Sequence, residues 1–442
     1  MKLDLDSALD FIRQHPKLVV ADDYELVGQQ TQGRSVSFNN GEAIHYFEES
    51  LWWIQLRILH RKRVGISSTV YCEEQGLNTL VESAFQLADN MMVDPWFRFP
   101  LWRVDKSHSG NNLPEDFRIH SKDHDFFQSL FPRLTQQPIG LEEKYGERWE
   151  SWKIFRKTEK QQRSFIKATQ KVGFSLVNQG PEGFFKIEES KGFSVGSQSK
   201  ERILDHLMLK AERLKYFRAS GKSEPGKFIL ASVVVASILE SIEKLFHGEI
   251  AGLGKSVYST QIENKIASSV VSLVDDGTMK VGEGFHQYDL EGTPGQRTVM
   301  VKEGVLKTFL HDATSSARFN RTSSGNLILG EANVPSVGVT NFYLEPSEKP
   351  LRNLFKEMKD GVYIECLDKS SRDLTRNGKL RLVGHGWRVS NGEPVEPIGH
   401  IVIAIDPIEI LKRITQVADD LEFWGRYGSP SVFIENMPLS EL

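Results

Sequence analysis

The first candidates for chemistry in this sequence are two histidines, His120 and His124, which lie four residues apart. On a helix this spacing places two imidazoles on one face, where they could ligate a metal ion. Asp116, Asp123 and Asp125 lie nearby, but Asp123 does not occupy the second position that a zincin-type helix motif requires. Since the flanking residues are only weakly periodic, a solvated polar face is the favoured interpretation, and a metal site is the alternative.

A third histidine stands in the triplet His247-Gly248-Glu249, directly after a predicted helix over residues 232–246. The helix dipole favours a histidine near a helix C-terminus, and Gly248 has the place of a C′ glycine. This position favours helix capping over catalysis.

Three glutamates and two glycine pairs complete the candidates. Glu42, Glu48 and Glu49 could be paired carboxylates, but their alternation suits an exposed sheet face equally well. The glycine pairs of residues 282–284 and 384–386 do not open a helix after a strand, so neither predicts a nucleotide-binding loop. The residues alone therefore predict no catalytic, cofactor-binding or metal-binding position.

Composition narrows the class of protein. The chain has 442 residues, which predicts two or three domains, and 26% of the residues are charged, as in globular proteins. Two cysteines, Cys72 and Cys366, are too few for a disulfide framework or a cysteine-rich zinc module. A formal charge of -4 gives no overall footprint for nucleic acid.

The sequence shows no pattern of export or membrane insertion. The start of the chain is acidic and amphipathic rather than basic and apolar, so we predict no signal peptide there. The longest apolar run covers residues 228–239, whereas a membrane-spanning helix needs about 20 residues. We therefore expect a buried segment in this run, and a cytoplasmic protein without membrane contact.

The first half of the chain alternates helix and strand patterns. Apolar spacing predicts helices over residues 3–14, 77–92 and 201–219. Strands are predicted at residues 24–29, 34–38, 43–49, 51–59, 64–71, 164–169 and 184–188, with a turn at Asn39-Asn40-Gly41. Residues 94–137 predict an extended loop with short helices, packed by its aromatic side chains.

The second half begins after a polar linker at residues 221–226. A strand at 227–230 and the helix 232–246 follow, with Ser232 as its predicted N-cap and Val234, Ile238, Ile242 and Leu245 as its buried stripe. Strands are then predicted at residues 268–274, 297–302, 305–309, 337–344, 361–365, 378–383, 387–390 and 400–404. Hairpin turns are predicted at residues 275–277, 303–304 and 391–392.

These patterns predict an α+β fold in two parts. Residues 1–220 form an N-terminal α+β domain with a sheet and covering helices, and residues 227–442 form a β-rich C-terminal domain of mainly antiparallel strands.

A string of motifs in the second half resembles the TldD/PmbA (TldE) family. The motifs occur in order as Ser256-Val-Tyr-Ser-Thr-Gln261, Val274-Asp-Asp-Gly-Thr-Met279, Asp289-Leu-Glu-Gly-Thr-Pro-Gly-Gln296, Glu303-Gly-Val-Leu-Lys-Thr-Phe309, Ser323-Ser-Gly-Asn326, Thr340-Asn341 and Pro346. The first half fits the family more loosely, through its helix, its strands up to Arg63-Val-Gly65 and the 77–92 helix.

The resemblance implies both a fold and a biochemical setting. Family members have an N-terminal α+β domain and a larger β-rich C-terminal domain. TldD-type subunits are zinc peptidases, and they work with a PmbA/TldE-type homologue that lacks the metal site. The pair forms a hollow dimer that cleaves flexible peptides, and an older label for the family is modulator of DNA gyrase, which suits an indirect effect.

The zinc-binding positions of the family fall on residues that do not ligate zinc. The TldD-type motif His-Glu-x-x-x-His, counted back from Asp275, aligns with Leu239 to Lys244 and retains only Glu240 as the general base. The family's third ligand is a cysteine in a glycine-rich turn, and the corresponding segment, residues 424–431, contains none. Glu240 is equally explained as an exposed helix residue, and the two cysteines of the chain as buried small side chains.

We therefore expect a non-catalytic, PmbA/TldE-like member that pairs with a TldD-type zinc peptidase in proteolysis or peptide maturation. One alternative is a divergent metallopeptidase that uses His247 with Glu249 or the pair His120 and His124. Another alternative is a homodimeric peptide-binding scaffold. No resident cofactor is expected, and the partners are flexible peptides and a second subunit, without direct nucleic-acid binding.

Overall fold

The computed structural model describes residues 3–39, 42–100, 102, 139–158, 161–180, 183–194, 226–330, 334–367, 373–374 and 379–437. The predicted pair His120 and His124, the predicted helix 201–219 and most of the 94–137 segment lie outside these residues, as does the linker up to residue 225. The division into domains at that linker stays a prediction.

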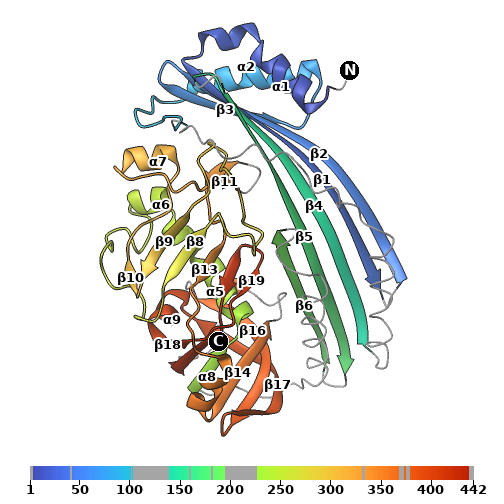
Figure 1. Cartoon of the computed structure of the whole chain (residues 1–442), viewed down its shortest axis with the longest axis vertical. Helices are drawn as coiled ribbons and strands as arrows, with labels where there is room; N and C mark the ends of the chain where they lie inside the picture. The colour runs from blue at the N-terminus through green and yellow to red at the C-terminus, as the bar shows by residue number, and fades with distance from the viewer. Residues whose placement is uncertain are drawn as a thin grey trace.

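A long antiparallel sheet forms the first half of the described chain (Figure 1). Its strand order is β3-β2-β1-β4-β5-β6. With a rise of about 3.3 Å per residue, its longest strands extend about 60 Å. The strands are β1 (Asp23–Asn39), β2 (Glu42–His60), β3 (Arg63–Thr69), β4 (Ile139–Arg156), β5 (Gln161–Gly180) and β6 (Gly183–Ser194).

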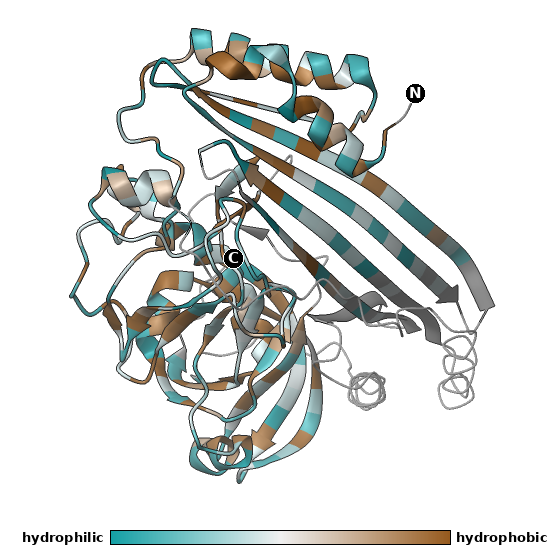
Figure 2. Ribbon diagram, turned by 45° about the horizontal axis from the view of Figure 1, so that its top comes forward, coloured by the Kyte–Doolittle hydropathy of each residue, from teal (hydrophilic) through white to brown (hydrophobic). Residues whose placement is uncertain are grey.

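The predicted strand 64–71 corresponds to β3, whereas the other predicted short strands of this half are segments of much longer ones. The predictions 24–29 and 34–38 merge into β1, and 43–49 and 51–59 merge into β2. The predicted hairpin between them is confirmed, since Asn39 pairs with Glu42. Figure 2 shows hydrophilic and hydrophobic bands alternating along these strands, as a sheet with two different faces requires.

Two helices cover one end of the long sheet (Figure 1). They are α1 (Leu5–Arg13) and α2 (Glu74–Asn90), and a 3₁₀ turn, η1 (Pro16–Val20), follows α1. Their apolar faces pack on Leu26, Leu56 and Ile58 of β1 and β2. The side chain of Asp4 accepts a hydrogen bond from the Ser7 amide and caps α1. The predicted helices 3–14 and 77–92 are thus confirmed, within a few residues at their ends.

The second half, which we call the body, contains two larger sheets and lies beside the long sheet (Figure 1). One sheet runs β10 (Val305–Leu306), β9 (Arg297–Lys302), β8 (Leu273–Asp276), β13 (Phe342–Leu344), β20 (Tyr427–Ser429) and β19 (Glu422–Trp424). The other runs β15 (Asp373–Leu374), β16 (Leu380–Ser390), β14 (Gly361–Leu367), β7 (Gly226–Leu230), β21 (Val432–Met437) and β18 (Ile414–Val417), with β17 (Glu393–Ile405) paired to β16.

The remaining elements of the body are short. A hairpin consists of β11 (Leu327–Leu329) and β12 (Pro335–Val337). The helices are α5 (Ser232–Ile242) with its 3₁₀ extension η2 (Glu243–Phe246), α6 (Gly248–Gly252), α7 (Ala313–Arg318), α8 (Leu351–Met358) and α9 (Pro407–Arg413). Most strand pairs are antiparallel, with β7–β14 and β13–β20 as parallel pairs, so the predicted α+β class is confirmed.

Helix α5 lies in the core of the body. Val234, Ile238 and Ile242 of the predicted stripe are buried, whereas Leu245 is partly buried and lies in η2. Val233, Val235 and Leu239 are buried as well, so the helix is enclosed on most of its circumference. A helix that is apolar nearly all round belongs in a core rather than at a surface. The predicted N-cap is wrong: Ala231 holds that position, and the Ser232 hydroxyl instead donates to Glu422 and accepts from Trp424.

Two of the three predicted hairpin turns are confirmed. Gly304 and Gly392 have positive φ angles of 81° and 80°, and each follows a residue that is also left-handed. Such paired left-handed residues form the two-residue turns that connect β9 to β10 and β16 to β17. The turn predicted at residues 275–277 is wrong in its first two residues, because Asp275 and Asp276 lie in β8 and are buried.

No helix in the described part of the chain is long and apolar enough to cross a membrane.

Candidate functional site at the junction of the sheet and the body

Where the long sheet meets the body, four charged side chains are fully or almost fully buried. Arg57 on β2 donates from Nε to Glu25 on β1 over 3.0 Å and contacts Glu291 of the body through Nη1 at 3.3 Å. Arg156 on β4 donates from Nη2 to Glu25 at 2.5 Å and to the backbone oxygen of Glu291 at 2.9 Å. We call this group of four residues the ion cluster. It joins strands of the sheet to one loop of the body.

The Glu291 loop is also held from the body side. The second carboxylate oxygen of Glu291 accepts a hydrogen bond of 2.8 Å from the Ala313 amide at the start of α7. Asp289 accepts from the amides of Glu291, Thr293 and Leu327. Burial raises the pKa of Asp289 to about 7 and the pKa of Glu291 to about 8, although Arg57 opposes the shift of Glu291. Both carboxyls therefore titrate close to neutral pH.

An aromatic cluster lies beside the ion cluster. Trp152 on β4 stacks on Phe165 on β5 with ring centroids 5.9 Å apart, and Phe165 contacts Tyr288 of the body at 6.1 Å. Trp102 donates to the Glu291 backbone oxygen, and the guanidinium of Arg156 lies 4.7 Å from its ring. We call the ion cluster and this aromatic cluster together the seam. Trp102 confirms aromatic packing for the one residue beyond 100 that the structure describes in that segment.

A cavity of about 260 Å³ opens within the seam. Its apolar wall includes Trp152, Phe165 and Leu327, and its polar lining includes Gln29, Lys167 and Arg426. Burial, followed by the neighbouring charge of Arg426, lowers the pKa of Lys167 to about 8. The cavity thus combines an aromatic surface with three cationic side chains, Arg148 and Lys167 from the long sheet and Arg426 from the body.

A buried histidine closes one side of this cavity. The two ring nitrogens of His286 lie 3.2 Å from the Gly284 oxygen and 3.0 Å from the Gly325 oxygen. Burial lowers its pKa to about 4, although both carbonyls oppose that shift. His286 is therefore neutral at pH 7, and it adds no positive charge to the lining.

The aspartate of the Val-Asp-Asp-Gly motif has an architectural role. Asp275 accepts three hydrogen bonds of 2.7 Å, from the Thr340 amide, the Thr340 hydroxyl and the Asn326 side chain. Burial raises its pKa to about 6. Asn341 donates to the backbone oxygens of Asp276 and Met279. These contacts tie three separate motifs together, so the residues that carry the family resemblance stabilise the body beside the cavity.

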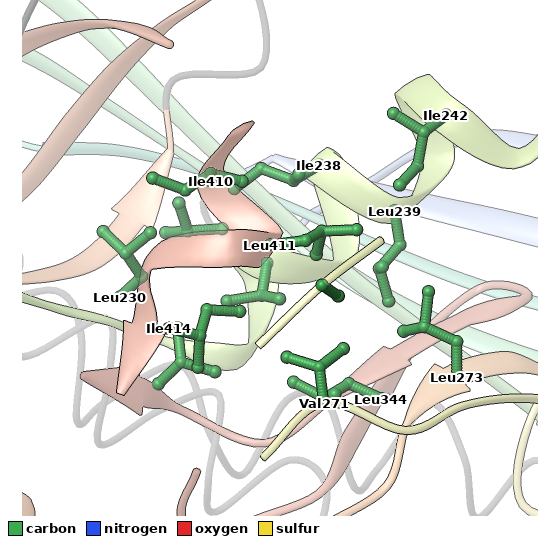
Figure 3. Close-up of a cluster of buried hydrophobic side chains, with 14 of the residues drawn as sticks. Leu230, Ile238, Leu239, Ile242, Val271, Leu273, Leu344, Ile410, Leu411 and Ile414 are labelled. Carbon is green, nitrogen blue, oxygen red and sulfur yellow. The ribbon is translucent and has the colours of Figure 1, made fainter. Parts of the chain in front are cut away.

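The residues at the family's zinc positions do not fit a zinc ion. Leu239 is an aliphatic side chain with no exposed surface, and Figure 3 shows it in the same apolar cluster as Leu273 and Leu411. Lys244 is an exposed cation at the end of the helix. Neither supplies the neutral imidazole that zinc requires at these positions. Glu240 is exposed, as an ordinary helix-surface residue is.

The turn that corresponds to the family's cysteine is occupied differently. Residues 424–431 contribute Arg426 to the cavity and Tyr427 to a hydrogen bond of 2.7 Å with Glu243. Among the residues that the structure describes, no group of three or more His, Cys, Asp or Glu side chains is arranged to hold a metal ion. Cys72 and Cys366 are both buried, as expected.

The alternative site at His247 and Glu249 is not assembled. Glu249 pairs with Arg318 at 3.2 Å, and the buried His247 forms no hydrogen bond or ion pair with it. The predicted capping is confirmed for His247, which is the C-cap of η2 and donates from its backbone amide to the Lys244 oxygen. Burial lowers the pKa of its imidazole to about 4. Gly248 is not a left-handed C′ residue; a β-carbon there would lie 2.1 Å from the His311 ring.

The three glutamates do not form a carboxylate pair in the described side chains. Glu48 accepts from Tyr46 and pairs with Arg34 at 3.1 Å on the exposed part of the sheet, and Glu49 lies 3.7 Å from Arg148. The side chain of Glu42 lies outside the described residues. The exposed-face interpretation therefore holds for Glu48.

Sequence reasoning missed the seam. Arg57, Arg156 and Glu25 are charged residues inside otherwise apolar strand segments, and this was the available signal for a buried ion cluster. Lys167 and Arg426 carried no comparable signal, because their proximity depends on how the sheet lies against the body.

Comparison with known proteins identifies relatives of the body. Residues 224–441 match a family model described as "PmbA/TldA metallopeptidase C-terminal domain". A "Metalloprotease TldD homolog" of Buchnera aphidicola subsp. Acyrthosiphon pisum is 28% identical over 246 residues, which is 54% of this chain and 51% of the relative. A "Metalloprotease" of Methanothermobacter thermautotrophicus is 28% identical over 193 residues, 42% of each chain. The chain spans about half the length of the curated relatives it matches.

Solved structures match over nearly the whole length. TldE from Thermococcus kodakarensis has a TM-score of 0.82 at 16% identity and covers 98% of both chains. A Thermotoga maritima protein called a "modulator of a DNA gyrase" has a TM-score of 0.82 at 17% identity, with 98% of this chain and 99% of that chain covered. At these identities the likeness shows a shared fold, including the long sheet.

Proposed function

Because this chain belongs to the PmbA/TldD family through its C-terminal domain at residues 224–441, we propose that it is a non-catalytic, TldE-like subunit. It pairs with a TldD-type zinc peptidase in proteolysis or peptide maturation. The observation that carries this proposal is the identity of the residues at the metal positions. They are Leu239, a core leucine on α5, and Lys244, an exposed lysine on its 3₁₀ extension η2.

The two substitutions oppose zinc in different ways. A histidine at position 239 would have to lie in an apolar cluster, where an imidazole without a hydrogen-bond partner is destabilising. A protonated lysine at position 244 offers no lone pair and repels a divalent cation. Without a metal-bound water, Glu240 has nothing to activate, so this chain supplies no hydrolytic step by the family's route.

A subunit without zinc can still bind peptides. The long sheet lies along the body, and the seam keeps the two at a defined distance. The cavity between them has an aromatic wall and polar groups, which is the usual lining of a peptide or small-molecule site. The subunit then shapes access to the zinc site of its partner rather than carrying out hydrolysis.

The proposal is tested with the purified chain, alone and mixed with a TldD-type homologue that carries His-Glu-x-x-x-His. We expect no stoichiometric zinc and no cleavage of a flexible peptide by the chain alone, and co-elution with the homologue in size-exclusion chromatography. Stoichiometric zinc together with cleavage by the chain alone would contradict the proposal. Elution as a homodimer that ignores the homologue would favour the scaffold alternative.

A matched pair of variants locates the activity of the complex. Replacing the motif glutamate of the homologue by glutamine should abolish cleavage by the mixture. Glu240→Gln in this chain should leave cleavage unchanged, because Glu240 has no metal beside it. Loss of activity with Glu240→Gln alone would show that this chain contributes a general base.

A further inference from the structure

Two cations in the seam cavity have no anionic partner. Lys167 forms no hydrogen bond or ion pair, and Arg426 forms only a long hydrogen bond of 3.4 Å to the Val339 backbone oxygen, for all contacts within the described residues. Lys167 comes from β5 of the long sheet and Arg426 from the β19–β20 turn of the body. An exposed surface would hydrate these charges, but a partly enclosed cavity hydrates them poorly.

The other charges around the cavity are already compensated. Arg148 pairs with Glu150 at 3.2 Å, and the other oxygen of Glu150 accepts from Trp152. Asp289 uses its oxygens on three backbone amides. Glu283 acts on Lys167 from beyond ion-pair distance and does not line the cavity. Lys167 and Arg426 together carry two positive charges, which Glu283 and the partly ionised Asp289, with its pKa of about 7, offset only in part.

The rest of the cavity lining suits an apolar group on the ligand. Trp152 and Phe165 stack with an angle of 5° between their rings, and Leu327 lies on the same cavity. The volume of about 260 Å³ lies just below the range of about 300–1,000 Å³ that is typical of drug-sized ligands, so it suits a single amino-acid residue. The Gln29 amide on β1 adds one neutral group that can donate or accept.

We propose that this cavity binds a carboxylate carried by an apolar residue of a peptide, with Lys167 and Arg426 holding the carboxylate oxygens. The apolar side chain then lies on the Trp152 and Phe165 rings. The carboxylate is either the free C-terminus of the peptide or a neighbouring acidic side chain. Since the cavity lies within one chain, binding of this ligand does not require a second subunit.

The charge state of Lys167 gives the site a distinct pH dependence. Its pKa of about 8 is set by burial and by Arg426 and Arg148, and Glu150 and Glu283 oppose that shift. A carboxylate binds the protonated lysine, so affinity is expected to fall as the pH rises from 7 to 9. His286, neutral at these pH values, does not titrate in this window. Asp289 also lines the cavity and loses its proton around pH 7, which lowers the affinity for a carboxylate in the same direction.

The test is calorimetric titration of the full chain with N-acetylphenylalanine and, in parallel, with its amide. We expect saturable binding of the acid, and we expect the affinity for the amide to be lower by a factor of about ten or more. An amidated dipeptide of N-acetylglutamate and phenylalanine separates the two sources of carboxylate. If it binds as tightly as N-acetylphenylalanine, the site accepts a neighbouring acidic side chain as well as a C-terminus. If it binds more weakly, the site is specific for the C-terminal carboxylate. Equal affinity for acid and amide, or no saturable binding of either, would overturn the proposal.

Matched variants assign the effect to the two cations. Lys167→Met and Arg426→Met should each weaken binding of the acid about tenfold, and Lys167→Arg should retain it. Lys171→Met is the control, because Lys171 lies four residues further on the same strand, is exposed and does not line the cavity. The fall in affinity between pH 7 and pH 9 should be smaller in Lys167→Met, because only the ionisation of Asp289 then contributes to it. Unchanged affinity in Lys167→Met, or equal loss in Lys171→Met, would contradict the site.

The outcome is separable from that of the proposed pairing. Lys167→Met should co-elute with a TldD-type homologue as the wild-type chain does. A chain that binds the acid without pairing would keep this site and refute the proposed function. A chain that pairs without binding the acid would do the reverse.

Discussion

The core around α5 and the seam are both buried, yet they are stabilised by different interactions. The core joins aliphatic side chains of α5 with those of the two body sheets, and Figure 3 shows carbon against carbon throughout. The seam joins two arginines, two glutamates and a group of aromatic rings. The core depends on the area removed from water, whereas the seam depends on each charge keeping its partner.

The two regions therefore differ in what they offer to a ligand. Leu239, at the position where the resemblance places a zinc ligand, is enclosed by apolar side chains of the core. In the seam, polar side chains such as Gln29 and Lys167 line an open cavity. A polar ligand therefore finds hydrogen-bonding groups in the seam, whereas the side chains around Leu239 are apolar.

The largest effect is expected from breaking the ion cluster. Arg57→Met leaves Glu25 and Glu291 buried without their shared partner, and loss of one partner of a buried pair costs about 3–5 kcal/mol. The free energy of unfolding from urea titration measures it. Arg388→Met is the control, because its pair with Glu396 is exposed and such pairs contribute about 0–1 kcal/mol. Equal effects of the two variants would show that the seam charges are solvated.

The next effect concerns the apolar core. Leu239→Ala should lower the free energy of unfolding by about 2–5 kcal/mol, because it opens a cavity in a fully buried cluster. Leu253→Ala makes the same substitution at an exposed position and should change stability by about 0.5 kcal/mol at most. A small effect at Leu239 would mean that position 239 is not part of the core, and its burial would then no longer oppose a metal ligand there.

A smaller effect tests close packing within the body against packing in the long sheet. Gly248→Ala should destabilise the protein by about 1–3 kcal/mol, because the new β-carbon meets the His311 ring. Gly146→Ala on β4 should be close to neutral, since its β-carbon would lie 3.6 Å from the nearest atom. Thermal unfolding of the two variants side by side measures the difference. A neutral Gly248→Ala would require that His311 moves aside freely.

The smallest effect is the pH dependence of the seam. The folded-state pKa of Asp289 is about 7 and that of Glu291 about 8, both above the ordinary carboxyl values, so the folded state binds these protons more tightly than the unfolded state. Their stabilisation is complete below about pH 4 and is lost as the pH rises through 7 and 8.

A variant isolates this contribution. Asp289→Asn should reduce the loss of stability between pH 5 and pH 8 by about 1–2 kcal/mol, measured by urea unfolding at several pH values. The exposed Asp419→Asn should follow the wild-type curve. A wild-type protein that gains stability over this pH range would contradict the raised pKa values.

The elements that lie in the body core were predictable because their apolar residues are continuous in sequence. The run 228–239 predicts burial, and it forms β7 and most of α5. The long strands were predicted in pieces, because residues 30–33 and 50 are polar or glycine. Once the sheet extends beyond the body, polar side chains continue the strand, since backbone pairing to β2 and β4 does not depend on them.

The seam could not be predicted, because it joins residues that are far apart in the chain. Arg57 contacts Glu25 across 32 residues and Glu291 across 234. Periodicity describes local burial and gives no register between a sheet and a separate body. The Asp275-Asp276-Gly277 turn failed for a similar reason: its local sequence favours a hairpin, but Thr340 and Asn326 supply hydrogen bonds that keep Asp275 in a buried strand.

The length of β1 and β2 makes the far end of the sheet sensitive to the angle at the seam. The ion cluster and the cavity contact the first half of β1, around Glu25 and Gln29, whereas the hairpin turn after Asn39 lies at the far end of the strand. Fourteen residues separate Glu25 from Asn39, which corresponds to about 45 Å at 3.3 Å per residue. A rotation of about 5° at the seam would therefore displace the tip of the hairpin by about 4 Å. Small changes among a few buried charges are thus amplified along the length of the sheet.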